Sequence, residues 1–158
     1  MSRRAQIEMS PDEVAAFLAQ ERTVTCATIG RGGRPHLMPL WYALDGEAIL
    51  CWTYASSQKA KNLERLAQAT LQVEAGLSYE ELRGVMMECD VELIREPERV
   101  REIGLAIALR YAPGQLTAET APAGLHEFVA RQATKRVGMR FTPTRTVSWD
   151  HRKLGGAY

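Results

Sequence analysis

The sequence predicts an α+β fold, mainly β, in which an antiparallel barrel or sheet carries peripheral helices. Two observations lead to this prediction. Segments with the patterns typical of strands outnumber those with helical spacing, and the first strands follow one another through hairpin turns. Strands joined by hairpins pair in antiparallel fashion, and helices then cover part of the apolar surface of the sheet.

The length of 158 residues favours one domain with its own core, which we place at residues 1–158. A net charge of +1 provides no global field for nucleic acid or an anionic membrane, so we expect neither partner, and any anion site must be local. No apolar stretch approaches the length that crosses a membrane, and the first residues lack a signal region. We therefore expect a cytoplasmic protein.

The three cysteines, Cys26, Cys51 and Cys89, stand far apart in strand-like segments. Such cysteines are most simply small buried apolar residues of a reducing compartment. Without a C-x-x-C pair, and without metal-ligand spacing among the three histidines, the sequence predicts no metal site.

The first predicted element is a helix that begins at residues 10–13. Its sequence, Ser-Pro-Asp-Glu, combines an N-cap serine, a first-turn proline and a capping-box glutamate. Val14, Phe17 and Leu18 then fall on one face, so we expect the helix to pack on a sheet.

Three strands follow, joined by turns. Residues 23–29 are rich in β-branched side chains and lead to the glycine-rich turn at 30–33. Residues 34–44 form the second predicted strand. The Asp-Gly pair at 45–46 is a strong hairpin signal and leads into the third strand, at residues 48–54.

Two more strands are predicted at residues 70–74 and 86–94. In the second of these, apolar side chains at odd-numbered positions alternate with mostly acidic ones at even-numbered positions, which indicates one wet or functional face. A helix begins at Glu96–Pro97, because Val100, Ile103 and Ile107 recur at helical spacing.

The last third of the chain predicts a loop, a helix, a strand and a tail. Apolar residues at 125, 128 and 129 indicate the helix, and alternation at 137–141 indicates the strand. Pro143 is expected to break this strand, with a continuation at 146–149. The tail, residues 150–158, is polar.

The most informative segment is 56–62, Ser-Ser-Gln-Lys-Ala-Lys-Asn, between the strand at 48–54 and a helix-like run at 63–67. The first N–H groups of a helix are unpaired and carry partial positive charge, so they attract phosphate. Ser56, Lys59 and Asn62 are three residues apart and share one helical stripe. We interpret the segment as a phosphate clamp; the alternative is a serine N-cap followed by solvated lysines.

The residues offer no self-sufficient catalytic group. The G-x-S-x-G, H-E-x-x-H and P-loop patterns are absent from the sequence. The acidic side chains of the strand at 86–94 are more simply a solvated face than a general acid and base. We therefore predict no catalytic residue, and expect a cofactor to carry any reaction.

Apolar and aromatic residues lie near the clamp in the predicted hairpin. Residues 38–42, Met-Pro-Leu-Trp-Tyr, precede the hairpin that leads to Trp52 and Thr53, so a partner strand would bring them beside the clamp. Such side chains suit a flat heteroaromatic ring. The alternative is that these aromatic residues are simple core.

The order of these motifs resembles the split β-barrel superfamily of pyridoxamine-phosphate-oxidase-like proteins, and within it the flavin/deazaflavin oxidoreductases that use coenzyme F-420. The resemblance runs from Arg22 to about Trp149. The matching segments are residues 33–36 with 39–42, 56–63, 82–85, and 140–143 with 148–150.

The resemblance implies a Greek-key-like split β-barrel that forms a homodimer with two cofactor sites at the subunit interface. The residues implied in phosphate binding are Ser56, Ser57, Lys59 and Asn62. The residues implied in placing the ring are Met38, Pro39, Leu40 and Trp41, with Thr53 nearby. Many relatives carry arginine near the position of Ser57, so Ser57 departs from the pattern.

Two further basic residues are expected to help. Lys61 is placed near the acidic glutamyl tail of coenzyme F-420. Independently of the resemblance, Lys153 in the tail is expected to reach the partner subunit's site; the alternative is a disordered basic tail. The function implied is hydride transfer from reduced coenzyme F-420 to an unsaturated small organic substrate. The alternatives are FMN with oxidase or reductase chemistry in the same fold, and a non-catalytic carrier of a flavin or haem.

Overall fold

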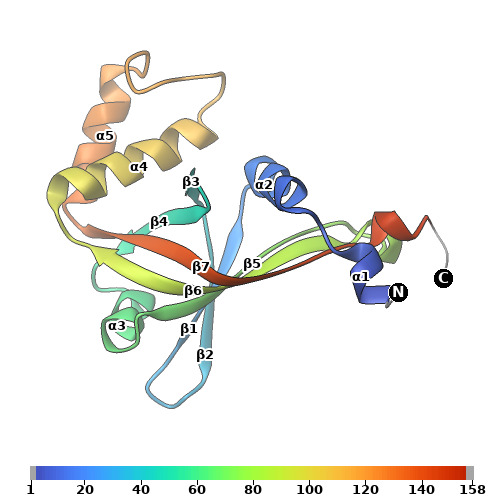
Figure 1. Cartoon of the computed structure of the whole chain (residues 1–158). Coiled ribbons are helices and arrows are strands. Elements are labelled where there is room, and N and C mark those ends of the chain that lie inside the picture. The colour runs from blue at the N-terminus through green and yellow to red at the C-terminus, as the bar shows by residue number, and fades with distance from the viewer. Residues whose placement is uncertain (1–2, 156–158) are drawn as a thin grey trace.

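The computed structural model describes residues 3–155 and confirms the predicted split-barrel architecture. Seven strands in the described part form one sheet in the order β2-β1-β5-β6-β7-β4-β3, with every neighbouring pair antiparallel (Figure 1). The strands are β1 Val24–Ile29, β2 Pro35–Leu40, β3 Ala43–Asp45, β4 Ala48–Tyr54, β5 Gln68–Ala75, β6 Arg83–Ile94 and β7 Arg136–Asp150. The helices are α1 Arg3–Ile7, α2 Pro11–Gln20, α3 Gln58–Arg65, α4 Pro97–Tyr111 and α5 Ala123–Ala133, with short 3-10 helices η1 Tyr79–Glu81 and η2 His151–Leu154.

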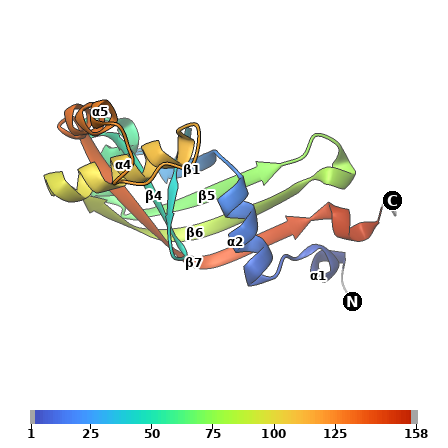
Figure 2. The ribbon, with the colours of Figure 1, turned by 90° about the horizontal axis from the view of Figure 1, so that it is seen from above.

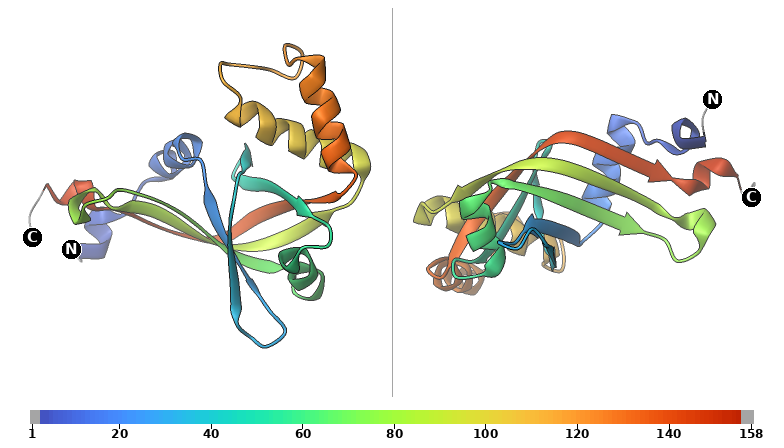
Figure 3. Two further views of the ribbon diagram at one scale, coloured as in Figure 1. Left: turned by 180° about the vertical axis from the view of Figure 1, so that it is seen from behind. Right: turned by 90° about the horizontal axis from the view of Figure 1, so that it is seen from below.

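The sheet is strongly curled, and helices lie on its periphery. Helix α2 lies across β5, β6 and β7, whereas α4 and α5 pack together at the other end of the sheet (Figure 2). Helix α3 lies beside the β1–β2 hairpin, which projects from the body of the molecule (Figure 3). The main core lies inside the curl, and a second apolar cluster under α4 includes Val100, Ile103 and Ile107.

Local sequence signals place the helices well. Ser10 caps α2 by accepting a hydrogen bond from the Glu13 N–H, and Glu13 returns the contact to the Ser10 N–H. Helices α4 and α5 also form where expected. Alternation along β6 is confirmed, since Met87, Cys89 and Val91 are buried while Asp90 and Glu92 are exposed.

The predicted strand at 34–44 is wrong as a single element. The structure divides it into β2 and β3, which lie at opposite edges of the sheet. Tyr42 in the connection is fully buried, and its hydroxyl donates to the carbonyls of Leu18 and Glu21. The expected pairing of residues 38–42 with Trp52 and Thr53 is also wrong, because β2 pairs with β1 and those two residues pair with β7.

The predicted break at Pro143 is also wrong, since β7 runs through it as one strand. Pro143 pairs with Cys89, directly at the register shift between Glu88 and Cys89. A proline has no N–H to donate, and a bulge is the place in a ladder that tolerates this loss. The tail then forms η2 through Leu154, where the sequence indicated only polar character.

Candidate functional site

The clamp segment forms the start of α3, which follows directly after β4. Ser57 is the N-cap, and its Oγ accepts a hydrogen bond from the Ala60 N–H at 3.3 Å. The N–H groups of the preceding two helical residues have no acceptor within the helix, and the helix dipole concentrates positive charge there. Ser56 lies just before the cap and is exposed, as is Lys61 on the first turn.

Lys59 points into the protein and not into solvent, with 7% of its surface exposed. Its Nζ donates to Thr53 Oγ1 at 3.1 Å, and Thr53 Oγ1 lies 3.2 Å from Ser57 Oγ. Burial lowers the pKa of Lys59; the nearby thiols of Cys26 and Cys51 oppose this shift.

Within residues 3–155, no carboxylate forms an ion pair with Lys59. An ammonium group has three donors, and a buried charge without a counter-charge is costly. The start of α3 therefore holds a buried cation whose charge the described chain does not neutralise. The alternative of solvated lysines is thus wrong for Lys59 and right for Lys61.

Asn62 holds α3 against the sheet. Its side chain is 1% exposed, donates to Thr28 Oγ1 of β1 at 3.0 Å and accepts from Gln58 Nε2 at 2.9 Å. Asn62 and Lys59 share the buried face of α3, so the stripe predicted from their spacing exists. Ser56 is not part of it, since it precedes the helix.

The residues predicted to place a ring lie on β2 and just after it, and β2 pairs with β1, the strand that Asn62 of α3 contacts. Met38 and Pro39 are exposed, Leu40 is half-buried, and Met38 pairs with Cys26 of β1. Trp41 is 60% exposed and stacks on Tyr111 of α4, with ring centroids 4.4 Å apart. One face of the indole is therefore backed by Tyr111, and its other face is open.

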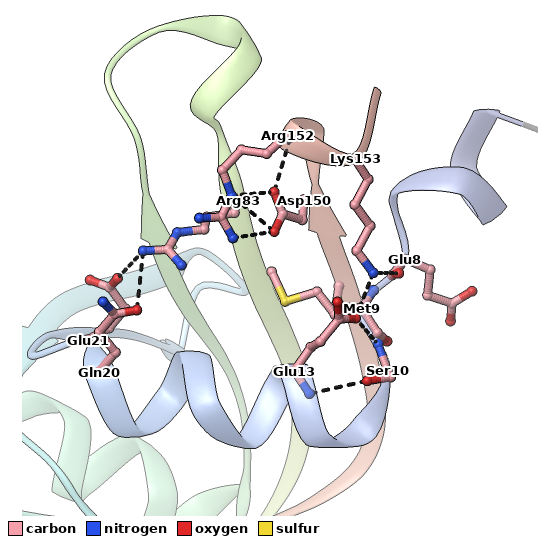
Figure 4. Close-up of polar contacts among 11 residues, drawn as sticks. Glu8, Met9, Ser10, Glu13, Gln20, Glu21, Arg83, Asp150, Arg152 and Lys153 are labelled. Atoms are coloured by element: carbon pink, nitrogen blue, oxygen red, sulfur yellow. Dashed lines mark hydrogen bonds and ion pairs between the residues drawn. The ribbon is translucent and has the colours of Figure 1, made fainter. Parts of the chain in front are cut away.

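Lys153 lies apart from this group. In η2, at the end of the sheet remote from α3, its Nζ donates to Glu13 Oε2 at 2.6 Å and to the Glu8 carbonyl at 2.8 Å (Figure 4). Within one chain it fastens the N-terminal segment to η2. A contact between Lys153 and a cofactor would have to be made across a subunit interface, as the sequence-based hypothesis for the tail requires.

Sequence reasoning missed Arg136, the first residue of β7. It pairs with Tyr54, the last residue of β4, at the point where the chain turns toward α3. The separation of these residues in sequence hides this proximity, and only the strand pairing reveals it.

No group of three or more His, Cys, Asp or Glu side chains within 3–155 is arranged to hold a metal ion. No helix in the described part of the chain is long and apolar enough to cross a membrane.

Residues 10–150 match the family model of pyridoxamine 5'-phosphate oxidase, so the chain belongs to that family. A conserved hypothetical protein from Mycobacterium tuberculosis is 42% identical, with a TM-score of 0.87 over 100% of this chain and 95% of that one. Among curated proteins, no sequence matches the chain.

More distant solved structures share the fold. An F420 reductase is 22% identical, with a TM-score of 0.64 over 87% of this chain and 98% of that one. The haem storage protein HutZ from Vibrio cholerae is 14% identical, with a TM-score of 0.66 over 87% of this chain and 94% of that one.

Proposed function

We propose that the chain is an oxidoreductase that binds coenzyme F-420 and reduces an unsaturated small organic substrate. The observation that carries the proposal is the buried, unneutralised ammonium of Lys59 at the start of α3. A phosphate group there would supply the missing negative charge and would face the positive end of the helix dipole. The sharing of the fold with an F420 reductase supports the choice of cofactor.

The residues present fit the phosphate end of such a cofactor. Lys59 offers donors that Thr53 does not use, and Ser56 and Ser57 offer hydroxyl groups beside the first helical N–H groups. Each contact to a charged phosphate would be charge-assisted and therefore stronger than a neutral hydrogen bond.

The residues near β2 fit a flat ring. The open face of Trp41 and the exposed side chain of Met38 provide an apolar surface, and Tyr111 holds the indole in place from behind. When bound, the deazaflavin supplies the hydride, while the protein orients the ring and excludes water. The proposal assigns no residue as the proton donor.

The proposal includes a homodimer with the cofactor at the interface. Strand β2 lies at one edge of the sheet and exposes Leu37, Met38 and the nearby Trp41, with 58% of Leu37 accessible. Exposed apolar groups gathered on an edge strand are typical of association surfaces. Light scattering is expected to report a dimer, and a monomer with full cofactor affinity would exclude an interface site. The free thiols of the three buried cysteines suit the cytoplasmic location expected from the sequence.

Fluorescence titration of the purified protein with coenzyme F-420 and with FMN tests the proposal. Tighter binding of coenzyme F-420 is expected, and a preference for FMN would replace the deazaflavin chemistry with flavin chemistry in the same site. Lys59→Met is expected to weaken binding by about 2–3 kcal/mol, because a charge-assisted contact is lost.

Lys61→Met is the matched control on the same helix. Lys61 is exposed, so any contribution it makes is long-range and is screened by salt. The effect of Lys61→Met should therefore disappear at high ionic strength, whereas that of Lys59→Met should persist. Equal affinity of wild type and Lys59→Met would refute the clamp.

A haem carrier is the second candidate, and His36 of β2 is the observation that favours it. Its Nδ1 is buried and has no hydrogen-bond partner in the described chain, next to the strand residues that suit a flat ring. HutZ, named as a haem storage protein, shares the fold. A haem absorption band that His36→Ala abolishes would establish this function; absence of haem binding would remove it.

A further inference from the structure

A cavity opens where β4 and β7 separate. The two strands pair only as far as Ile49 and Phe141, whereas β7 continues, paired with β6, as far as Asp150. Beyond Phe141 the described part of β7 therefore has no strand partner on the side of β4. Helix α2 lies across the strands in this region (Figure 2), so the space between the diverging strands is walled by a helix.

The cavity has the size and the apolar walls of a small-molecule site. Its volume is about 450 Å³, within the range of roughly 300–1,000 Å³ that ligand pockets commonly have. Helix α2 contributes lining residues at the spacing of one helical stripe, namely Pro11, Val14, Ala15 and Leu18. Met87 of β6 lines the cavity as well. Together these side chains form an apolar surface on which a hydrocarbon body can be buried.

The cavity is separate from the candidate cofactor site. None of the described residues that line it belongs to β1, β2 or α3, the elements that form that site. The lining comes instead from the segment before α2, from α2 itself, from β3 and its turn into β4, and from β6 and β7. A ligand in this cavity would therefore not take the place proposed for the phosphate or for the ring.

Two carboxylates without a counter-charge belong to the lining. Glu8 lies just before α2 and Glu47 lies in the turn from β3 to β4; both are exposed. Neither forms an ion pair within residues 3–155. Lys153 contacts Glu8 only at the backbone carbonyl, and its charge is matched by the carboxylate of Glu13 (Figure 4).

The positive charge in the lining is already neutralised. Arg145 is the one basic residue among the described residues that line the cavity, and its Nη1 donates to Glu88 at 3.0 Å. The hydroxyl of Thr144 is also engaged, since it donates to the Glu88 carbonyl. The uncompensated charge of the lining is therefore negative, and its free charged groups are hydrogen-bond acceptors.

We propose that this cavity is a second ligand site, which takes a small apolar amine. The hydrocarbon body packs against the α2 stripe and Met87, and the ammonium group lies toward Glu8 and Glu47. An ammonium has three donors and no acceptor, so it complements two free carboxylates, whereas an acid of the same shape would meet like charge. Exposed ion pairs are individually weak, so the apolar body supplies most of the affinity and the carboxylates supply the selectivity for a cation.

The test is an NMR titration of the full-length protein with phenylbutylamine, phenylbutanol and phenylbutyrate, which share one body and differ in the charge of one end. The amine is expected to bind about tenfold more tightly than the acid, with the alcohol between them. The amide signals that shift should be those of α2 and of residues 143–148, and not those of α3. Equal affinities for the three compounds, tightest binding of the acid, or no binding would overturn the proposal.

Two neighbouring alanines of α2 provide a matched pair of variants that tests the location. Ala15 lines the cavity and Ala16 does not, and both are exposed positions of the same helix. Ala15→Leu places a larger side chain in the cavity and is expected to weaken binding of the amine by about tenfold or more. Ala16→Leu should bind the amine as wild type does. Wild-type affinity in Ala15→Leu would overturn the location.

Replacing both carboxylates tests the selectivity. In the double variant Glu8→Gln, Glu47→Gln the amine and the alcohol should bind with nearly equal affinity, because only the apolar contacts remain. A preference for the amine as large as that of wild type would overturn the role assigned to the two carboxylates.

A last titration separates this site from the cofactor site. Saturation of the protein with coenzyme F-420 or with FMN should leave the affinity for the amine unchanged, since the described linings have no element of β1, β2 or α3 in common. Displacement of the amine by either cofactor would overturn the second site. A protein that binds the amine at α2 and binds neither cofactor would retain this site and lose the flavin assignment.

Discussion

Gly104 of α4 lies directly against the indole of Trp52 in β4. A Cβ atom at position 104 would stand 2.2 Å from Cζ3 of Trp52, which is far inside van der Waals contact. The guanidinium of Arg136 lies over the ring of the same indole, with its central carbon 4.6 Å from the ring centre. Trp52 therefore contacts α4 and also lies under the guanidinium of Arg136 at the start of β7.

Gly104→Ala is expected to destabilise the protein by about 1–3 kcal/mol, because Trp52 must shift to admit a methyl group in a packed interface. Alanine has a helix propensity more favourable than that of glycine by about 1 kcal/mol, so the variant is destabilised only if the clash with Trp52 costs more than this gain. Gly124→Ala in α5 is the control, since a Cβ there would meet no atom within 4 Å. Chemical denaturation should rank the two variants on opposite sides of wild type; a stabilised Gly104→Ala would contradict the tight approach.

Lys59→Met is expected to stabilise the fold near neutral pH by on the order of 1 kcal/mol, because it removes a buried charge that lacks a counter-charge. The folded pKa of Lys59 lies below its ordinary value of 10.5. At a pH between the lowered folded pKa and 10.5, Lys59 is protonated in the unfolded chain but not in the native chain. The stability of wild type relative to the variant therefore rises with pH in this range.

The advantage of Lys59→Met should therefore be largest below the lowered pKa and shrink as the pH approaches 10.5. Urea denaturation of both proteins across this range measures it. A difference that does not change with pH would mean that the pKa of Lys59 is not lowered in the native state. Stability gained by a variant that loses phosphate binding is the trade expected of a functional site.

The parts of the fold that the sequence predicts are those that depend on neighbours in the chain. The capping box of Ser10 and Glu13 is a contact between residues three apart, and the alternation along β6 reflects the pleat of a single strand. Lys59 and Asn62 share a face for the same reason, since helical spacing is local.

The wrong predictions arise where contacts between residues distant in sequence determine the structure. The chain from β2 to β3 crosses between the two edges of the sheet because the sheet curls, and nothing between residues 34 and 44 encodes that curl. Pro143 stays inside β7 because the register of β6 shifts opposite it. Arg136 lies next to Tyr54 only because β4 and β7 pair, so periodicity has no means of predicting this contact.

The three cysteine thiols are expected to be unreactive in the native state. Burial raises the pKa of Cys26 to about 11 and that of Cys89 to about 12, and it raises the pKa of the fully buried Cys51 as well. Since the thiolate is the reactive form, labelling by a disulfide reagent at pH 8 should be roughly a hundredfold or more slower than in denaturant. Rapid labelling of any native thiol would show that the barrel opens locally at that strand.

Asp150 is expected to hold the two ends of the chain together. Its carboxylate accepts from the backbone N–H of Arg152 at 3.0 Å and from Arg152 Nε at 2.8 Å, which orders η2 (Figure 4). Lys153 in the same turn then binds Glu13 and the Glu8 carbonyl, while the Met9 N–H donates to Ser148 Oγ. The N-terminal segment therefore depends on the geometry that Asp150 imposes.

The hydrogen bonds from Arg152 lower the pKa of Asp150 below its ordinary value of 3.8, against the opposing effect of burial. A carboxyl group with a lowered folded pKa stabilises the native state above its unfolded pKa, and this contribution is lost as the pH falls through the folded value. Asp150→Asn should therefore cost about 1–2 kcal/mol at neutral pH and progressively less in acid.

Hydrogen exchange provides the specific readout. In Asp150→Asn the amide of Met9 should exchange faster than in wild type. The exchange rates of core amides in β6 should change only as much as the free energy of global unfolding changes. Asp90→Asn is the control, because Asp90 is an exposed residue of β6 and its loss should change stability by no more than about 0.5 kcal/mol. Unchanged protection of Met9 would show that η2 and the N-terminal segment are held by Lys153 alone, independently of the turn that Asp150 caps.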